Sequence, residues 1–285
     1  MIDSLRCGKQ WLDVSRLSPP KVMGILNVTP DSFSDGGLFV SVTQALQQAH
    51  CMVAEGAAII DVGGESTRPG AAEVSVQHEI DRVIPVIDAI ARECDTIISV
   101  DTRKPEVMRA AVEAGAGMVN DVRALREPGA LDAASEAVNA LGVAVCLMHM
   151  QGKPRVMQEK PEYDDVVETV KGFLQARIAA CTTAGIALDN IVIDPGFGFG
   201  KIVRHNLQLV NQLSAFSSLG APILMGVSRK SSIGAILDKP TDQRLAGSLA
   251  MATLCCQQGA AIIRAHDVAE TVDALKICHA VIRAL

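Results

Sequence analysis

The chain has 285 residues, of which 49% are hydrophobic and only 3% aromatic, and it carries a formal net charge of −6. This length allows one well-buried domain built mainly from Val, Ile, Leu and Ala. The acidic balance, without any run of like charges, does not favour binding to nucleic acid or to an anionic membrane.

No apolar stretch approaches the roughly 18 residues that cross a membrane, and the first twenty residues lack the apolar centre of a signal peptide. Eight cysteines are present, including the neighbours Cys255 and Cys256, but none are spaced as CxxC. Several of them, such as Cys51, Cys146 and Cys278, fall in apolar patterns. We therefore expect buried, reduced thiols in a cytoplasmic protein rather than disulfides or a zinc site.

Short runs rich in Val and Ile are expected to be buried strands, and helical patterns separate them. In chain order the strands are expected at 21–27, 57–63, 96–101, 117–121, 143–148, 190–194, 222–227 and 260–265. Apolar residues recur at helical spacing between the strands and after the last one, where Val272 and Ile282 are expected on the buried face of a helix. Pro105 and Gly115 mark the start and the end of another helix.

This alternation over this length predicts an α/β fold with a single-domain (β/α)8 TIM barrel formed by residues 21–285. An open doubly wound sheet is the alternative. Residues 1–20 are expected to pack on the barrel as an extension that plugs or flanks its N-terminal end. In both folds the active site lies at the C-terminal ends of the strands.

Two segments after the first two strands, 27–39 and 63–75, are long and rich in Gly and Pro. Ordinary connections of this kind have about 2–6 residues. Both segments carry Asp, Arg, Ser or Thr, so we expect lids that close over a substrate rather than surface decoration.

Three expected strands end on side chains suited to a flat, nitrogen-rich ligand. Asp194 precedes Pro195 and the glycine-rich run 196–200, which allows the backbone to approach a ligand closely. A buried carboxylate there would pair with two adjacent N–H groups, as in an amidine, a guanidine or a 2-amino-4-oxopyrimidine ring. Asn120 offers a donor and an acceptor but equally suits a turn, and Asp101 equally suits a helix cap.

Basic and hydroxyl groups follow the last two expected strands. Lys230 could donate to a ring carbonyl or nitrogen, and Ser231 and Ser232 are expected to cap the helix that begins there and to bind a carboxylate or phosphate. Arg264 could stack on a flat ring or bind an oxyanion, and His266 could contact phosphate or act as a cap.

Other familiar catalytic patterns do not occur in the sequence. It contains no Ser-His-Asp arrangement, no Walker motif and no GxGxxG. His149 is expected to be structural, because no second histidine has the spacing of a metal ligand.

Taken together and in order, these blocks resemble the dihydropteroate synthases of the folate pathway. The similar segments are GILNVTPDSFSDGG (24–37), GGESTRPGA (63–71), SVDTRKPEV (99–107), NDV (120–122), LMHM (147–150), DPGFGFGK (194–201), GVSRKS (226–231) and RAHDV (264–268). The resemblance covers almost the whole chain. It implies a (β/α)8 barrel that condenses (7,8-dihydropterin-6-yl)methyl diphosphate with 4-aminobenzoate, releasing diphosphate and forming 7,8-dihydropteroate.

The resemblance also implies site residues. The pterin would be bound by Asp101, Asn120, Asp194, Lys230 and Arg264, in a pocket lined by Met148, Phe199 and Gly226. Mg²⁺ would be bound by Asn27 with help from Asp35, and the diphosphate by Thr67, Arg68 and His266. The aminobenzoate pocket would comprise Phe33, Pro69, Lys230 and Ser231. The implied catalytic groups are Lys230, Asp35 and Arg68.

The implied mechanism is SN1-like, with diphosphate leaving before the amine attacks and with no protein nucleophile. Sensitivity to sulfonamides, which mimic 4-aminobenzoate, is expected, as is a homodimer formed through outer helices near the C-terminus. Two alternatives remain open: a pterin-binding methyltransferase that serves a corrinoid, and a non-catalytic pterin-binding subunit. Neither needs the groups expected to bind Mg²⁺ and diphosphate.

Overall fold

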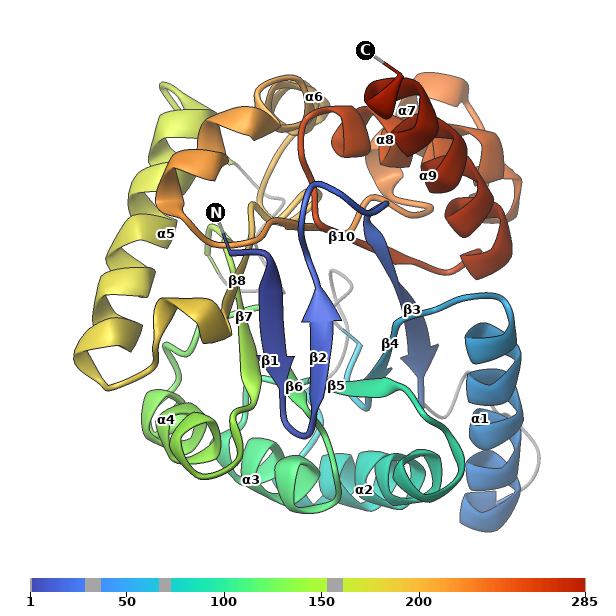
Figure 1. Ribbon diagram of the computed structural model, residues 1–285, viewed down its shortest axis with the longest axis vertical. Helices are drawn as coiled ribbons and strands as arrows, with labels where there is room; N and C mark the ends of the chain where they lie inside the picture. The colour runs from blue at the N-terminus through green and yellow to red at the C-terminus, as the bar shows by residue number, and fades with distance from the viewer. Residues whose placement is uncertain (1, 29–36, 67–72, 153–160, 285) are drawn as a thin grey trace.

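A computed structural model describes residues 2–28, 37–66, 73–152 and 161–284. Its main sheet has eight parallel strands in the order β8-β7-β6-β5-β4-β3-β10-β9. The two edges meet through a parallel bridge between Ile193 and Ile223, which brings the sheet round into a barrel (Figure 1). The predicted barrel is therefore confirmed, and the open sheet is excluded.

The barrel strands are β3 (Lys21–Asn27), β4 (Ile59–Gly63), β5 (Ile97–Asp101), β6 (Met118–Asp121), β7 (Ala144–Met148), β8 (Ile191–Asp194), β9 (Leu224–Met225) and β10 (Ile262–Ala265). The first matches its predicted range. Most of the others begin one or two residues late, and β9 is reduced to two residues, with only an isolated bridge at Ile223 before it.

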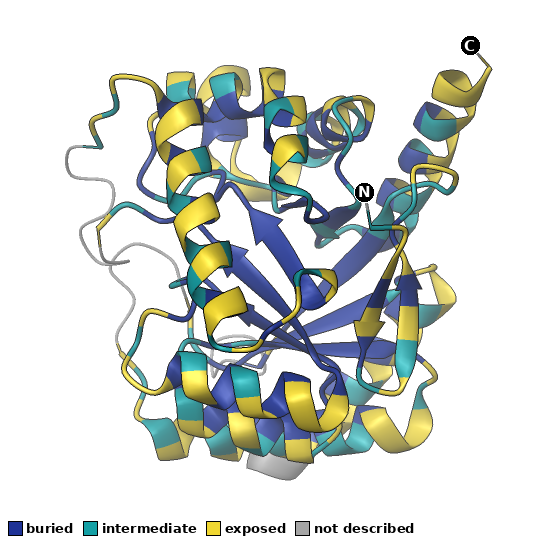
Figure 2. Cartoon of the chain, turned by 60° about the vertical axis from the view of Figure 1, so that its left-hand side comes forward, coloured by how far each residue is buried: buried dark blue, intermediate teal, exposed yellow. Residues whose placement is uncertain are grey.

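The helices are α1 (Gly37–Ala54), α2 (Val76–Glu93), α3 (Pro105–Glu113), α4 (Ala130–Leu141), α5 (Val166–Thr183), α6 (Val203–Asn211), α7 (Ser231–Leu237), α8 (Leu245–Gln257) and α9 (Val268–Arg283), with short 3-10 helices η2 (Leu188–Asn190), η3 (Leu213–Leu219) and η4 (Thr241–Gln243). They surround the buried strands and expose their outer faces (Figure 2). Within the described ranges, no helix combines the length and apolar character needed to cross a bilayer.

The residues predicted to start and end α3 are confirmed, whereas the predicted buried face of α9 is only partly correct. Pro105 begins α3, and Gly115 follows its end with a φ of +117°, as predicted. In α9 the buried side chains include Leu275 and Cys278, whereas Ile282 is 38% exposed. The prediction for Ile282 was wrong because the buried positions of α9 end at Cys278 and its last turn is exposed.

All eight cysteines are free thiols, as expected. Cys146 and Cys278 are buried, but Cys51 is exposed, so the prediction of burial was wrong at that position. Cys51 lies beside Met52, whose side chain faces the barrel, and a neighbouring helix position necessarily points elsewhere.

An N-terminal hairpin, β1 (Ser4–Cys7) and β2 (Gln10–Asp13), lies across one end of the barrel (Figure 1). Its buried side chains Leu5, Cys7 and Leu12 share a cluster with the first inward residues of the strands, such as Ile59 and Met118. The hairpin therefore covers the N-terminal end of the barrel, and the opposite end is left to the polar residues.

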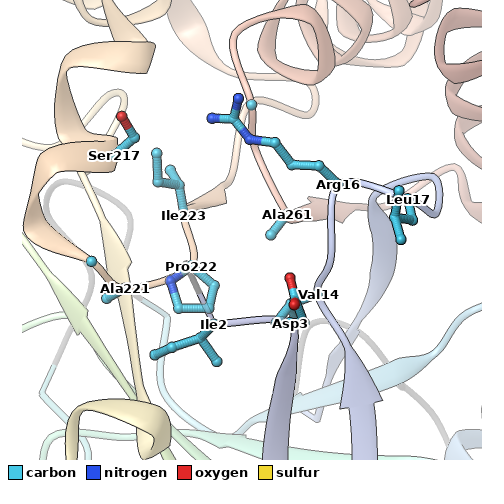
Figure 3. Close-up of a pocket in the computed structure, with 12 residues that line it drawn as sticks. Ile2, Asp3, Val14, Arg16, Leu17, Ser217, Ala221, Pro222, Ile223 and Ala261 are labelled. Atoms are coloured by element: carbon cyan, nitrogen blue, oxygen red, sulfur yellow. The ribbon is translucent and has the colours of Figure 1, made fainter. Parts of the chain in front are cut away.

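A cavity of about 260 Å³ opens beside this N-terminal segment. It is lined by Val14 and Arg16 together with Pro222, Ile223 and Ala261, which lie at or before the starts of β9 and β10 (Figure 3). None of the described site residues lines it, so the candidate site lies elsewhere.

Candidate active site

Side-chain alternation brings polar groups to the interior at the C-terminal end of the barrel. Ile59 and Met118 belong to the inner cluster, so Asp61 and Asn120, two positions later on β4 and β6, share that inner face. The strand register sets Gly63 beside Asp101 and Asp101 beside Asn120. The barrel therefore presents a ring of buried polar side chains directly above its apolar layer.

Arg264 on β10 joins two carboxylates across this ring. Its Nε lies 2.6 Å from Asp61 Oδ2, and its Nη2 lies 3.0 Å from Asp101 Oδ2. Asn120 Nδ2 also donates to Asp61 Oδ2, at 3.1 Å. Burial raises the pKa of Asp101 to about 7, while the positive charge of Arg264 opposes that rise. The predicted residues Asp101, Asn120 and Arg264 are thus held together.

Asp61 was missing from the predicted site. It is fully buried, and its Oδ1 has no hydrogen-bond partner among the residues the structure describes. The signal was present in the sequence, because a carboxylate between Ile60 and Val62 must be paired if that strand is buried. It was overlooked because it lies inside the apolar run instead of at its end.

Asp194 ends β8 and is buried beside the glycine-rich segment 195–200. Its Oδ1 accepts a hydrogen bond of 2.7 Å from the N–H of Gly196, which holds the carboxylate in one orientation. Burial raises the pKa of Asp194, against the effect of that hydrogen bond. Gly196 and Gly198 have φ of +72° and +83°, which explains the need for glycine in this turn.

Lys230 reaches over the same segment. Its ammonium donates to the carbonyl of Phe197 and lies 4.1 Å from the centre of the Phe199 ring. Burial lowers its pKa to about 8, while Asp194 acts in the opposite direction. Phe199 in turn packs with Met148, so the predicted Met148, Asp194, Phe199 and Lys230 lie together. Gly226 lies near Arg264: a Cβ at Gly226 would be 3.9 Å from the Cβ of Arg264.

The predicted serine caps were wrong. Lys230 occupies the cap position of α7, and no side chain there makes a capping hydrogen bond. Ser231 is the exposed first residue of the helix. Ser232 is buried and its Oγ accepts from Asn206 Nδ2 at 2.9 Å, so it is occupied by a structural contact. The helix begins one residue earlier than expected because the lysine takes the extended cap conformation.

His266 follows β10, and its Nδ1 lies 3.0 Å from Ser228 Oγ. The same hydroxyl accepts from the N–H of His266 at 3.2 Å. Asn27 ends β3 with its side chain near Gly63: its Oδ1 would lie 3.8 Å from a Cβ at that glycine, with Asp101 on the same side. The expected metal ligand therefore lies next to the polar ring.

His149 is structural, as expected. Its ring meets Phe173 edge-on at 4.9 Å, and its Nδ1 lies 3.0 Å from the ammonium of Lys201. No group of three or more potential metal ligands from His, Cys, Asp and Glu occurs in the described part of the chain. The other predicted site residues, Phe33, Asp35, Thr67, Arg68 and Pro69, lie outside the described residues.

Comparison with known proteins gives a consistent result. The family model described as "Pterin binding enzyme" matches residues 23–266. The dihydropteroate synthase of Escherichia coli K12 is 55% identical over 268 residues, which cover 94% of each chain.

Solved structures agree. A Yersinia pestis dihydropteroate synthase in a sulfonamide drug complex has a TM-score of 0.92 and 51% identity, and it covers 99% of this chain and 100% of its own. The Xanthomonas albilineans dihydropteroate synthase in complex with 7,8-dihydropteroate has a TM-score of 0.87 and 48% identity, and the match covers 99% of each chain. This chain therefore belongs to the pterin-binding enzyme family, among the dihydropteroate synthases.

Proposed function

We propose that the chain condenses (7,8-dihydropterin-6-yl)methyl diphosphate with 4-aminobenzoate, releasing diphosphate and forming 7,8-dihydropteroate. The observation that carries the proposal is a group of side chains at the C-terminal end of the barrel, in which Asn120 and Asp194 are buried and Asp101, Lys230 and Arg264 are half-buried. It combines carboxylates, an amide and cations around one point, which suits a flat ring with both donors and acceptors on its edge.

Each group has a proposed contact. Asp194 keeps one oxygen bound to Gly196 and offers the other to the amino-pyrimidine edge of the pterin. Arg264 is already held by two carboxylates, so its guanidinium plane can stack on the pterin ring without a further loss of side-chain entropy on binding. Met148 and Phe199 supply apolar contacts, and Gly226 leaves room beside Arg264.

The diphosphate and its metal belong beside this pocket. Mg²⁺ is commonly bound by one or two protein oxygens together with substrate phosphates, and Asn27 offers such an oxygen near the polar ring. Bound there, Mg²⁺ would neutralise charge on the leaving diphosphate. We assign Asp35 to the same metal ion and the diphosphate contacts to Thr67, Arg68 and His266.

The reaction proceeds by loss of diphosphate from the methylene carbon, followed by attack of the amine nitrogen on that carbon and release of one proton. The electron-rich pterin spreads the positive charge of the intermediate, and no protein nucleophile is required. We place the amine in a pocket of Phe33, Pro69, Lys230 and Ser231. Rapid quenching during turnover should trap no covalent adduct of the protein, and an adduct would refute this path.

The proposed function is tested by supplying both substrates and Mg²⁺ to the purified chain and detecting 7,8-dihydropteroate by mass spectrometry. Product should form, and it should disappear when EDTA removes the metal. A pterin-binding subunit would bind the pterin without forming product, and a methyltransferase would likewise form none.

The charge of Lys230 can be tested by pH. Because its pKa is lowered to about 8, its ammonium is lost as the pH rises through that value. We expect kcat/KM for the pterin substrate to fall about thirtyfold between pH 7 and pH 9.5, since this ratio reports ionisation of the free enzyme. Lys230→Arg, which stays charged, should lack that fall. A flat profile in the unmodified protein would contradict the role.

Sulfonamides should inhibit by occupying the aminobenzoate pocket. In steady-state assays sulfamethoxazole is expected to raise the KM for 4-aminobenzoate while leaving kcat unchanged. Undiminished turnover with saturating sulfonamide at low amine concentration would count against the pocket.

We further propose a homodimer formed through α8 and α9. Leu254, Ile277 and Val281 are 47%, 70% and 61% exposed. The two helices are joined beside them by Cys278 Sγ, which donates to the carbonyl of Thr253 at 3.4 Å. This apolar surface supports a partner of the same chain.

Ile277→Glu is expected to give a monomer in light scattering after size exclusion, because a charge would be buried at the interface. Leu141→Glu on the exposed face of α4 is a control that should remain dimeric. A monomeric unmodified chain, or a dimeric Ile277→Glu variant, would refute this interface.

A further inference from the structure

Lys201 is a buried lysine that the proposed chemistry does not use. It follows the segment 195–200 and is only 2% exposed. Its ammonium lies 2.8 Å from the carbonyl of Gly196, 2.9 Å from that of Phe199 and 3.0 Å from His149 Nδ1. A lysine has three N–H donors, and these contacts occupy all three.

The contacts that the structure describes for this ammonium are with two carbonyl oxygens and a ring nitrogen, and none is with a carboxylate. Burial accordingly lowers its pKa to about 7, with Asp194 opposing the change from farther away. The partner ring must accept, so His149 is neutral, and burial lowers its pKa to about 2. A buried charge of this kind costs stability unless hydrogen bonds compensate for it, and here two carbonyls and a ring nitrogen supply them.

The three contacts join two parts of the barrel mouth. Gly196 and Phe199 lie near opposite ends of the segment 195–200, whereas His149 directly follows β7. The segment lies so close to that histidine that a Cβ at Gly196 would come within 1.8 Å of its carbonyl oxygen. Lys201 therefore holds an irregular turn against the end of a strand.

The same turn sets the position of the proposed pterin contacts. Its Gly196 N–H orients Asp194 at 2.7 Å. Its Phe197 carbonyl accepts from Lys230, and its Phe199 ring lies 4.1 Å from the same ammonium. A shift of this turn would move both charged groups at once.

We propose that Lys201 is a positioning residue for the pterin site, which orients Asp194 and Lys230 by holding the turn 195–200 against His149. The proposal rests on the pterin contacts proposed above for those two residues. Lys201 itself touches neither substrate, so its effect is on the placement of other groups, where misplacement by about 1 Å can cost a hundredfold in rate.

The test compares Lys201→Met with Tyr163→Phe. The tyrosine hydroxyl donates to the carbonyl of Gly200 at 2.8 Å, so its removal takes one hydrogen bond from the same turn but leaves Gly196 and Phe199 held. Binding of 6-hydroxymethylpterin is followed by fluorescence titration, and the KM of each substrate is measured with the other one saturating. Thermal unfolding reports stability.

Lys201→Met is expected to weaken pterin binding at least about tenfold and to raise the pterin substrate KM, while the KM for 4-aminobenzoate changes less than about threefold. Tyr163→Phe should change pterin binding less than threefold. Pterin binding within twofold of the unmodified protein in Lys201→Met would overturn the proposal, and so would equal losses in the two variants.

Two further variants keep the outcome decisive. Lys201→Gln retains donors for the carbonyls and replaces Lys201→Met if that variant does not fold; an intermediate loss of pterin affinity is expected, and no loss overturns the proposal. Asp194→Asn reports on the site itself. If it binds pterin normally, the proposed pterin contact fails; if it loses binding while Lys201→Met does not, only the positioning role fails.

Discussion

Asp194→Asn is expected to lower kcat/KM for the dihydropterin diphosphate by about a hundredfold or more, equivalent to roughly 2.7 kcal/mol of transition-state stabilisation. The Asn oxygen can still accept from Gly196, so the turn keeps its 2.7 Å hydrogen bond. The NH2 group of the asparagine then faces the N–H groups on the pterin edge. Donors face donors there, whereas the carboxylate of Asp194 accepted hydrogen bonds from both N–H groups. Hydrogen bonds to a charged group are worth about 1.5–3 kcal/mol, which sets the scale of the loss.

The matched control is Asp121→Asn, a second buried carboxylate at a strand end. Its two oxygens accept from the N–H groups of Arg123 and Leu125, both at 2.7 Å, so both oxygens are used within the protein. This variant should lose stability with a smaller effect on kcat/KM, whereas Asp194→Asn should lose activity with little change in melting temperature. If both variants lost stability and activity to the same extent, Asp194 would have a structural role only.

Asp61→Ala is expected to have the largest effect on stability. It removes one carboxylate from Arg264 and the acceptor of Asn120, and breaking a buried ion pair costs about 3–5 kcal/mol. Because Arg264 keeps Asp101 at 3.0 Å, we expect the lower end of that range. Chemical denaturation measures the loss directly.

The same variant should weaken pterin binding at least about tenfold, since Arg264 is no longer held from both sides. Asp61→Asn preserves shape and an acceptor, and it should lie between the unmodified protein and Asp61→Ala in both measurements. Unchanged stability and unchanged pterin binding in Asp61→Ala would contradict the role of Asp61 in the ring of polar groups.

Much of the barrel was predictable because strand and helix patterns alternate cleanly. The segment 21–27 is apolar and starts with a charged residue, and it became β3 without change. The segment 222–227 became a strand of only two residues preceded by the single bridge at Ile223, since strand length depends on backbone hydrogen bonds to the neighbouring strands and not on hydrophobicity. The exposure of the last turn of α9 depends on where the helix stops contacting the rest of the fold, which no local sequence pattern predicts.

The candidate site was predictable where a polar residue ends an apolar run. Asp101, Asn120, Asp194 and Arg264 satisfy that rule, and the structure brings them together. Asp61 breaks the rule, because its position inside a strand places it in the second layer of the barrel interior.

Two other features of the site were not predicted correctly, for different physical reasons. The role of Lys201 could not be anticipated, because its partners lie on a turn and at the end of another strand that only the fold brings near. Ser231 and Ser232 were misassigned as caps because the helix start shifted by one residue, a difference that composition does not determine.

The central claim is that this barrel joins the two substrates with loss of diphosphate. The most direct measurement supplies the purified chain with the dihydropterin diphosphate and Mg²⁺, with and without 4-aminobenzoate, and counts diphosphate released against dihydropteroate formed. We predict one diphosphate per dihydropteroate and little release when the amine is left out. Equal release without the amine, or binding of the pterin with no turnover at all, would contradict the account.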